Sequence, residues 1–140
     1  MTRRFLFSTI LLVALLVAAC GSSATGGNVS GTSWVMTGFE GLMGAGLQDL
    51  PPSGVTLSFG TDGSLQGMGA CNSFNGTYTT DGNTLKIPGP LASTMKSCGD
   101  SLDAWENAYF TFLTGNPKYS VNGGTLELSG ASTKVTYASS

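Results

Sequence analysis

Three acidic residues, Asp100, Asp103 and Glu106, are the side chains of this sequence whose types and spacing could support catalysis. Two carboxylates held about 5 to 9 Å apart can hydrolyse a glycosidic bond. The sequence contains no histidine, which excludes Ser-His-Asp and Cys-His catalysis and removes the usual general base near neutral pH. Acids at the start of a helix commonly serve its dipole and solubility. We therefore expect a protein that is not an enzyme, and a carboxylate-dependent hydrolase is kept as a contrasting hypothesis.

The three acids surround the start of a segment, residues 101–113, that has the pattern of an amphipathic helix. Large apolar residues recur in it at spacings of three and four, and they are Leu102, Trp105, Tyr109, Phe112 and Leu113. Asp100 or Ser101 is expected to cap the helix start, and Gly115 with Pro117 to end it. Burial of such side chains against a sheet, at about 1.5 to 3 kcal/mol each, would make the helix a main source of stability.

The rest of the sequence from Ser33 onward alternates with a period of two, which is typical of half-buried strands. In residues 55–59, for example, Val55, Leu57 and Phe59 share one face. Turn signals of the Asp-Gly and Asn-Gly type separate such runs at residues 62–63, 81–83 and 122–124. Three hairpin signals with a single helix predict an α+β fold, with an antiparallel β-meander and the helix packed against it.

The first nineteen residues have the pattern of a signal peptide. Arg3 and Arg4 precede an apolar run, residues 5–19, whose helix would rise about 22 Å and so fall short of a membrane span. The run ends in Val17-Ala18-Ala19-Cys20, which resembles the lipobox of bacterial lipoproteins, where the cysteine is lipidated. Cys20 would then carry acyl chains that anchor the protein to the membrane outside the cytoplasm. The alternative is a plain secretory signal with Ala-x-Ala-type cleavage.

Cleavage before Cys20 would leave a flexible tether, residues 20–31, followed by a folded domain, residues 32–140. The tether is composed of small and polar residues that behave as a flexible coil. Cleavage also removes both arginines, so four lysines remain against eight acids, a formal charge of −4. This charge argues against nucleic-acid binding and against electrostatic adhesion to anionic lipid.

The cysteine count favours a disulfide. Assigning Cys20 to the lipid leaves Cys71 and Cys98 as an even pair in an oxidising compartment. Two unpaired thiols are the alternative, whereas two cysteines without histidine fall short of a zinc site. We expect no metal and no cofactor.

Residues 38–54, which contain Pro51 and Pro52, predict a long surface loop, although their apolar residues could instead fold back onto the core.

One stretch of the sequence resembles a known family. The run GACNSFNGTY, residues 69–78, is followed by Ser93-Thr94-Met95, Cys98, and a helix that carries Glu106. Together they are similar to the META domain family of HslJ-like bacterial lipoproteins, over residues 34–137. Methionine stands one place early at Met95, and Ser97 replaces an alanine of the family pattern. The resemblance implies a strongly curved, barrel-like antiparallel sheet with one helix, a cell-envelope setting and links to heat stress and antibiotic tolerance.

These features favour a non-enzymatic, monomeric envelope lipoprotein that binds an envelope partner. The candidate binding residues are Asn72, Ser73, Asn75, Tyr78 and Thr94, although short polar residues beside a cysteine often bond the backbone in turns. An alternative is an inhibitor of a lytic enzyme or protease that inserts residues 38–54 into the target's cleft.

Overall fold

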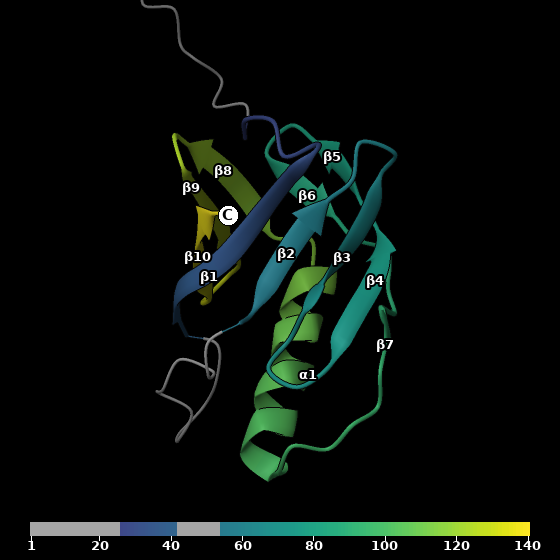
Figure 1. Ribbon diagram of the computed structural model, residues 1–140. Helices are drawn as coiled ribbons and strands as arrows, with labels where there is room; N and C mark the ends of the chain where they lie inside the picture. Colours follow the sequence, from purple (N-terminus) through teal and green to yellow (C-terminus); the bar gives the residue numbers. More distant parts are fainter. Residues whose placement is uncertain (1–25, 42–53) are drawn as a thin grey trace, which may run out of the picture.

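The computed structural model describes residues 26–41 and 54–140, which form ten antiparallel strands in one sheet and a single helix (Figure 1). The elements are β1 (Thr32–Glu40), β2 (Thr56–Phe59), β3 (Ser64–Met68), β4 (Ser73–Thr77), β5 (Thr79–Asp81), β6 (Thr84–Lys86), β7 (Ala92–Ser93), α1 (Asp100–Thr114), β8 (Lys118–Asn122), β9 (Thr125–Ser129) and β10 (Lys134–Ser139). The strand order is β5-β6-β8-β9-β10-β1-β2-β3-β4-β7.

Two meanders, β1 to β4 and β8 to β10, join where β1 pairs with β10. The chain passes from β4 to β5 through the single residue Tyr78, although these strands stand near opposite ends of the strand order. Such a short link requires the sheet to curl on itself, and α1 lies on its concave side (Figure 1). The predicted α+β fold, a curved antiparallel sheet with one helix, is confirmed.

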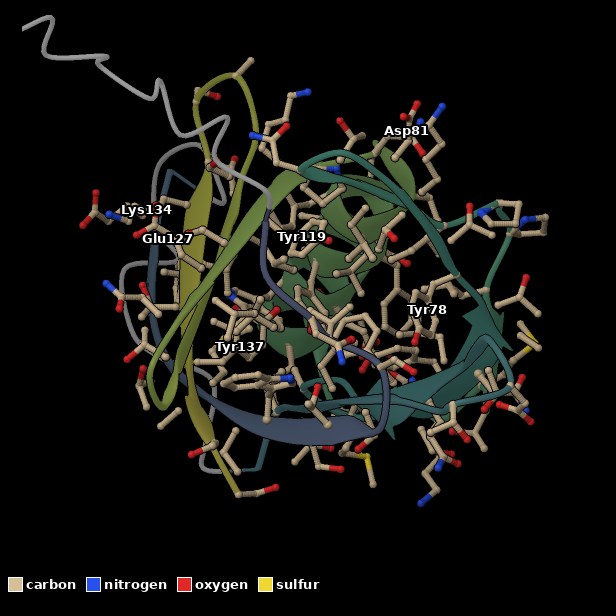
Figure 2. All side chains as sticks on the ribbon, turned by 90° about the horizontal axis from the view of Figure 1, so that it is seen from above. Tyr78, Asp81, Tyr119, Glu127, Lys134 and Tyr137 are labelled. Atoms are coloured by element: carbon tan, nitrogen blue, oxygen red, sulfur yellow. A yellow bond between two sulfur atoms is a disulfide. The ribbon has the colours of Figure 1, made fainter. Side chains whose placement is uncertain are left out.

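The period-two pattern has the expected physical basis. Val55, Leu57 and Phe59 of the β2 region are all buried, while Thr56 and Ser58 between them face outward. At the predicted 62–63 turn, Gly63 adopts a positive φ of 82°, a conformation that suits glycine. Figure 2 shows Tyr78, Tyr119 and Tyr137 inside the curl and Asp81, Glu127 and Lys134 outside it.

Helix α1 buries the centre of the predicted stripe, whereas Leu102 and Phe112 are only half-buried. Trp105, Tyr109 and Leu113 are buried, and the Trp105 ring stacks on Tyr109 at 5.2 Å between centroids. The Trp105 ring also meets Phe39 of β1 edge-on, at 5.6 Å. Within the described residues, no helix is both long and apolar enough to cross a membrane.

The predicted capping of α1 by Asp100 or Ser101 is wrong. The N-cap position is occupied by Gly99, which has no side chain to offer an acceptor. Asp103, in the first turn, accepts hydrogen bonds from the Cys98 backbone N–H at 2.9 Å and from the Ser97 hydroxyl at 2.6 Å. The carboxylate thus fastens the chain that enters the helix, rather than the helix N–H groups. Gly115 ends the helix as expected, with its N–H bonded to the carbonyl of Phe112.

The expected tether overlaps the folded domain. Val29 is buried, the Gly26 carbonyl accepts from the Val121 N–H at 2.8 Å, and the Gly31 N–H donates to the Phe59 carbonyl at 2.8 Å. Residues 26–31 therefore belong to the domain, because their backbone groups supply bonds that side-chain composition does not reveal.

Several predictions concern residues that the structure does not describe. The signal peptide, Cys20 and the rest of the expected tether fall in residues 1–25, and most of the 38–54 loop falls in residues 42–53. Of that loop, residues 38–40 belong to β1.

Candidate functional site

A disulfide joins the turn after β3 to the segment that precedes α1. Cys71 and Cys98 form this bond with their Cα atoms 6.0 Å apart, and they stand 27 positions apart in the sequence. The expected pairing is therefore present. A closed loop of this length stabilises a fold by about 3 to 4 kcal/mol through the reduced entropy of the unfolded chain.

Beside the disulfide, α1 contributes a buried carboxylate that holds the same turn. Glu106 is only 5% exposed. One of its oxygens accepts the backbone N–H groups of Cys71 at 2.8 Å and Asn72 at 2.7 Å, and the other accepts the Asn72 side-chain amide at 2.6 Å. Charge-assisted bonds of this kind offset the loss of hydration of a buried carboxylate.

Asn72 extends this network to the segment between β7 and α1. Its side-chain oxygen accepts the Thr94 hydroxyl at 2.7 Å and the Lys96 N–H at 2.8 Å, while its side-chain nitrogen also donates to the Lys96 carbonyl at 3.0 Å. We call Cys71, Asn72, Thr94, Lys96, Cys98 and Glu106 the clasp. It binds the β3–β4 turn, the 94–98 segment and α1 to one another.

Two of the three acids considered for catalysis border one hollow, and the third lies apart from it. Asp100 is exposed, whereas Asp103 and Glu106 border a hollow of about 250 Å³ under residues 93–97. Both of these carboxylates accept hydrogen bonds from the protein's own N–H and O–H groups. The Cys98 N–H and the Ser97 hydroxyl lower the pKa of Asp103. The geometry of both residues is that of structural acceptors.

On the opposite, convex face of the sheet lies a larger depression, which we call the outer hollow. It has a volume of about 680 Å³ and extends over β2, β3, β4 and β7. Its lining includes Thr56, Gln66, Met68, Ser73, Asn75 and Ser93, and every lining residue within the described part of the chain is neutral. In the ladder between β3 and β4, Gln66 stands directly opposite Asn75, and Met68 opposite Ser73.

The structure distributes the five predicted binding residues over three places. Asn72 is buried in the clasp, Ser73 and Asn75 line the outer hollow, and Thr94 belongs to the clasp and also borders the hollow. Tyr78 is a core residue, whose hydroxyl donates to the Gly60 carbonyl at 2.9 Å. These five residues therefore do not form one patch.

Sequence reasoning missed three groups of the site: the Glu106 carboxylate as an acceptor for the β3–β4 turn, and Gln66 and Ser93 in the hollow. The alternation of β3 carried the signal for Gln66, because the residue follows the buried Leu65 and so faces outward.

Comparisons with known proteins agree with this fold. A family model described as the META domain matches residues 27–140. No curated protein matches the chain.

Among solved structures, one similar to this chain is the NMR structure of a protein from Burkholderia xenovorans, with a TM-score of 0.66, 20% identity and 99% of each chain covered. A second NMR structure of a protein has a TM-score of 0.57 and 23% identity, covering 77% of this chain and 88% of the other. The crystal structure of a duf4847 family protein from Bacteroides vulgatus has a TM-score of 0.55 and 17% identity, covering 79% and 93%. At these identities the likeness concerns the fold.

Proposed function

Since this chain belongs to the META domain family, we propose that it is a non-enzymatic lipoprotein of the bacterial cell envelope whose META domain binds another envelope component. The observation that carries the binding role is the contrast between the two sides of the β3–β4 hairpin. On one side the carboxylates of Glu106 and Asp103 are engaged in structural hydrogen bonds. On the other, neutral polar side chains line an open hollow of about 680 Å³ on strands.

The envelope setting is supported by the sequence of the first twenty residues. A positive start at Arg3 and Arg4, an apolar run and the Val17-Ala18-Ala19-Cys20 ending are together typical of a lipidated precursor. Attachment through Cys20 would hold the domain at the membrane surface. We further propose that the domain acts there as a monomer. The resemblance to stress-linked relatives favours a role in tolerance of heat or of antibiotics.

Site-specific photo-crosslinking in cells tests the binding role. A photoreactive residue replaces Gln66 in the hollow or, as a matched control, Thr125 on the outer face of β9, which is exposed. We expect a reproducible crosslinked envelope component from position 66 and none from position 125. Equal patterns at the two positions, together with a deletion strain as tolerant of heat and antibiotics as its parent, would contradict the proposal.

The anchor has its own test. Mass spectrometry of the protein from membranes should show an N-terminal Cys20 that carries acyl chains. An unmodified N-terminus would refute the proposal that the protein is a lipoprotein, but it would not affect the proposed binding role of the domain.

A further inference from the structure

The side chains of the outer hollow have unused hydrogen-bonding capacity. Within residues 26–41 and 54–140, the side chains of Gln66, Ser73, Asn75 and Ser93 make no hydrogen bond to another protein group. Each amide offers two donors and an acceptor, and each hydroxyl both donates and accepts. Gln66 and Asn75 face each other across the β3–β4 ladder. Because these groups project from strands, their spacing is fixed before any ligand arrives.

The charge of the lining restricts the class of ligand. Among the residues that the structure describes, no Asp, Glu, Lys or Arg lines the hollow, so a charged ligand would find no oppositely charged side chain there to offset the loss of its hydration. A wholly apolar ligand would remove water from the four polar side chains without giving them new partners, which is unfavourable. A neutral ligand with many hydrogen-bonding groups satisfies both constraints.

The position of the hollow also helps to decide between two classes of neutral ligand, an extended peptide and a sugar. Peptides that join a sheet bond to the free backbone groups of an edge strand. Most of the hollow is instead lined by the face of β2, β3 and β4, where the backbone ladders are already paired. At its rim, β7 is an edge strand, but its two residues offer few backbone groups to an extended peptide. Recognition there depends on side chains, and hydroxyl and amide side chains complement sugar hydroxyls.

One apolar side chain completes the arrangement. Met68 is 43% exposed and lines the hollow opposite Ser73. Its thioether is flexible and polarisable, so it can adapt to an irregular surface. A pyranose ring presents such a surface along its C–H face.

We propose that the outer hollow binds a neutral oligosaccharide, with Gln66, Ser73, Asn75 and Ser93 hydrogen-bonding its hydroxyl groups and Met68 contacting its C–H face. The volume, about 680 Å³, lies within the range of about 300 to 1,000 Å³ for small-molecule sites. The inference rests on the proposed function, because it names the chemistry of what the binding domain recognises.

An NMR titration of the purified full-length protein in mild detergent tests this inference. The probes are tetrasaccharides of N-acetylglucosamine, of β-1,4-linked glucose and of α-1,4-linked glucose, with tetragalacturonate as the charged comparison. We expect saturable shifts of the backbone amides at residues 64–68, 73–75 and 92–94 with at least one neutral sugar and none with tetragalacturonate. No saturable shift with any neutral sugar, or equal binding of the charged one, would overturn the inference.

Two variants assign the binding to the hollow. The double change Gln66→Ala and Asn75→Ala removes two amide groups and is expected to raise Kd about ten-fold or more, while Thr125→Ala on β9 leaves Kd unchanged. Ser73→Trp, which fills the hollow from an exposed position, is expected to abolish the shifts. An unchanged Kd in a folded double variant would overturn the assignment.

The crosslinking experiment described above separates this inference from the proposed function. If a protein is captured at position 66 and no neutral sugar binds, the proposed binding function stands and the inference that the ligand is an oligosaccharide is overturned. Failure of both experiments would remove both.

Discussion

Asn72 donates its backbone N–H and its side-chain amide to the two oxygens of the Glu106 carboxylate, at 2.7 and 2.6 Å, although the two residues stand 34 positions apart in the sequence. The carboxylate belongs to the buried side of α1 and the asparagine to the turn between β3 and β4. The disulfide from Cys71 to Cys98 spans the same junction. Covalent and polar links therefore reinforce one another where the helix meets the sheet, on the reverse side of the hairpin whose strands line the outer hollow.

Removal of the Glu106 carboxylate should destabilise the domain. Glu106→Ala leaves the N–H groups of Cys71 and Asn72 and the Asn72 amide without their acceptor. Buried donors that lose a charged partner are costly, and we expect the free energy of unfolding to fall by about 3 kcal/mol. Urea unfolding under oxidising conditions measures the change. The control is Glu127→Ala, which breaks a partly exposed ion pair with Lys134 and should change stability by about 1 kcal/mol or less. Equal effects of the two substitutions would refute the structural role of Glu106.

Gly69 should be coupled to Glu106. A Cβ atom at position 69 would overlap the carboxylate, since the Glu106 Cδ lies 3.0 Å from that point. Three hydrogen bonds fix this side chain, so it cannot move aside without loss. Gly69→Ala should therefore destabilise the wild-type protein by about 1 to 3 kcal/mol and the Glu106→Ala variant by much less. A double-mutant cycle in urea measures this coupling. Additive losses would show that the two positions do not interact.

Loss of the disulfide should lower stability without changing the fold. The double variant Cys71→Ser and Cys98→Ser frees a chain segment of 27 residues, and we expect a loss of about 3 to 4 kcal/mol. The clasp hydrogen bonds do not involve the disulfide sulfurs, apart from a long contact of Cys71 with the Lys96 carbonyl at 3.7 Å, and should persist. Thermal unfolding with and without reductant measures the loss, since reductant should affect the wild type and not the variant. A wild type insensitive to complete reduction would contradict this prediction.

Local patterns in the sequence account for the elements of this fold but not for their arrangement. The alternation around Leu57 and Leu65 and the helical spacing of Trp105 and Tyr109 each identify a buried face. The pairing of β1 with β10 joins residues about a hundred positions apart, and no local period encodes it. The attachment of residues 26–31 to the domain could not be predicted for a related reason, because backbone groups make most of the hydrogen bonds that hold this segment.

The candidate site shows the same division. A disulfide between Cys71 and Cys98 could be predicted because cysteine number and compartment restrict the choices. The partner of Glu106 could not be predicted, because the helical spacing places Glu106 next to Trp105 but does not specify that its carboxylate lies against a turn 34 positions away in the sequence. Asn72 and Ser73 are neighbours with opposite directions, one buried and one exposed, so their grouping into one patch ignored the period of two.

Acid should weaken the attachment made by Asp103. The Cys98 N–H, first, and the Ser97 hydroxyl lower the pKa of this carboxyl below its ordinary value of 3.8. A folded-state pKa below the unfolded one contributes stability that is complete above about pH 4 and is lost as the pH falls through the folded value. We expect the stability difference between the wild type and Asp103→Asn to shrink as the pH falls from 7 to 2.

A carboxyl ¹³C titration should place the midpoint of Asp103 below 3.8. Ser97→Ala, which removes one of the two donors, should move this midpoint upward. A midpoint at the ordinary value would refute the attachment.

Alkali should act through the buried pair Tyr109 and Tyr137, whose hydroxyl oxygens lie 2.9 Å apart. Burial, first, raises the pKa of both phenols well above the ordinary value of 10.0, and for Tyr109 the bond to Tyr137 opposes the rise only in part. Below pH 10 both phenols are neutral whether the chain is folded or not, so they add no pH dependence there. Above pH 10 the unfolded chain ionises while the folded one does not, and stability should fall as the pH rises.

Ultraviolet absorbance of tyrosinate should show two phenols that ionise only when the protein unfolds, and the double variant Tyr109→Phe and Tyr137→Phe should lose this delayed step. Tyr109→Phe alone leaves the Tyr137 hydroxyl without its partner in the core and should lower the free energy of unfolding by about 1 to 3 kcal/mol. The double variant replaces both hydroxyls with apolar groups and should recover much of that loss. The single variant Tyr137→Phe completes the comparison. A double variant that loses more stability than the two single variants together would contradict the buried pair, as would four phenols that ionise together in the native protein.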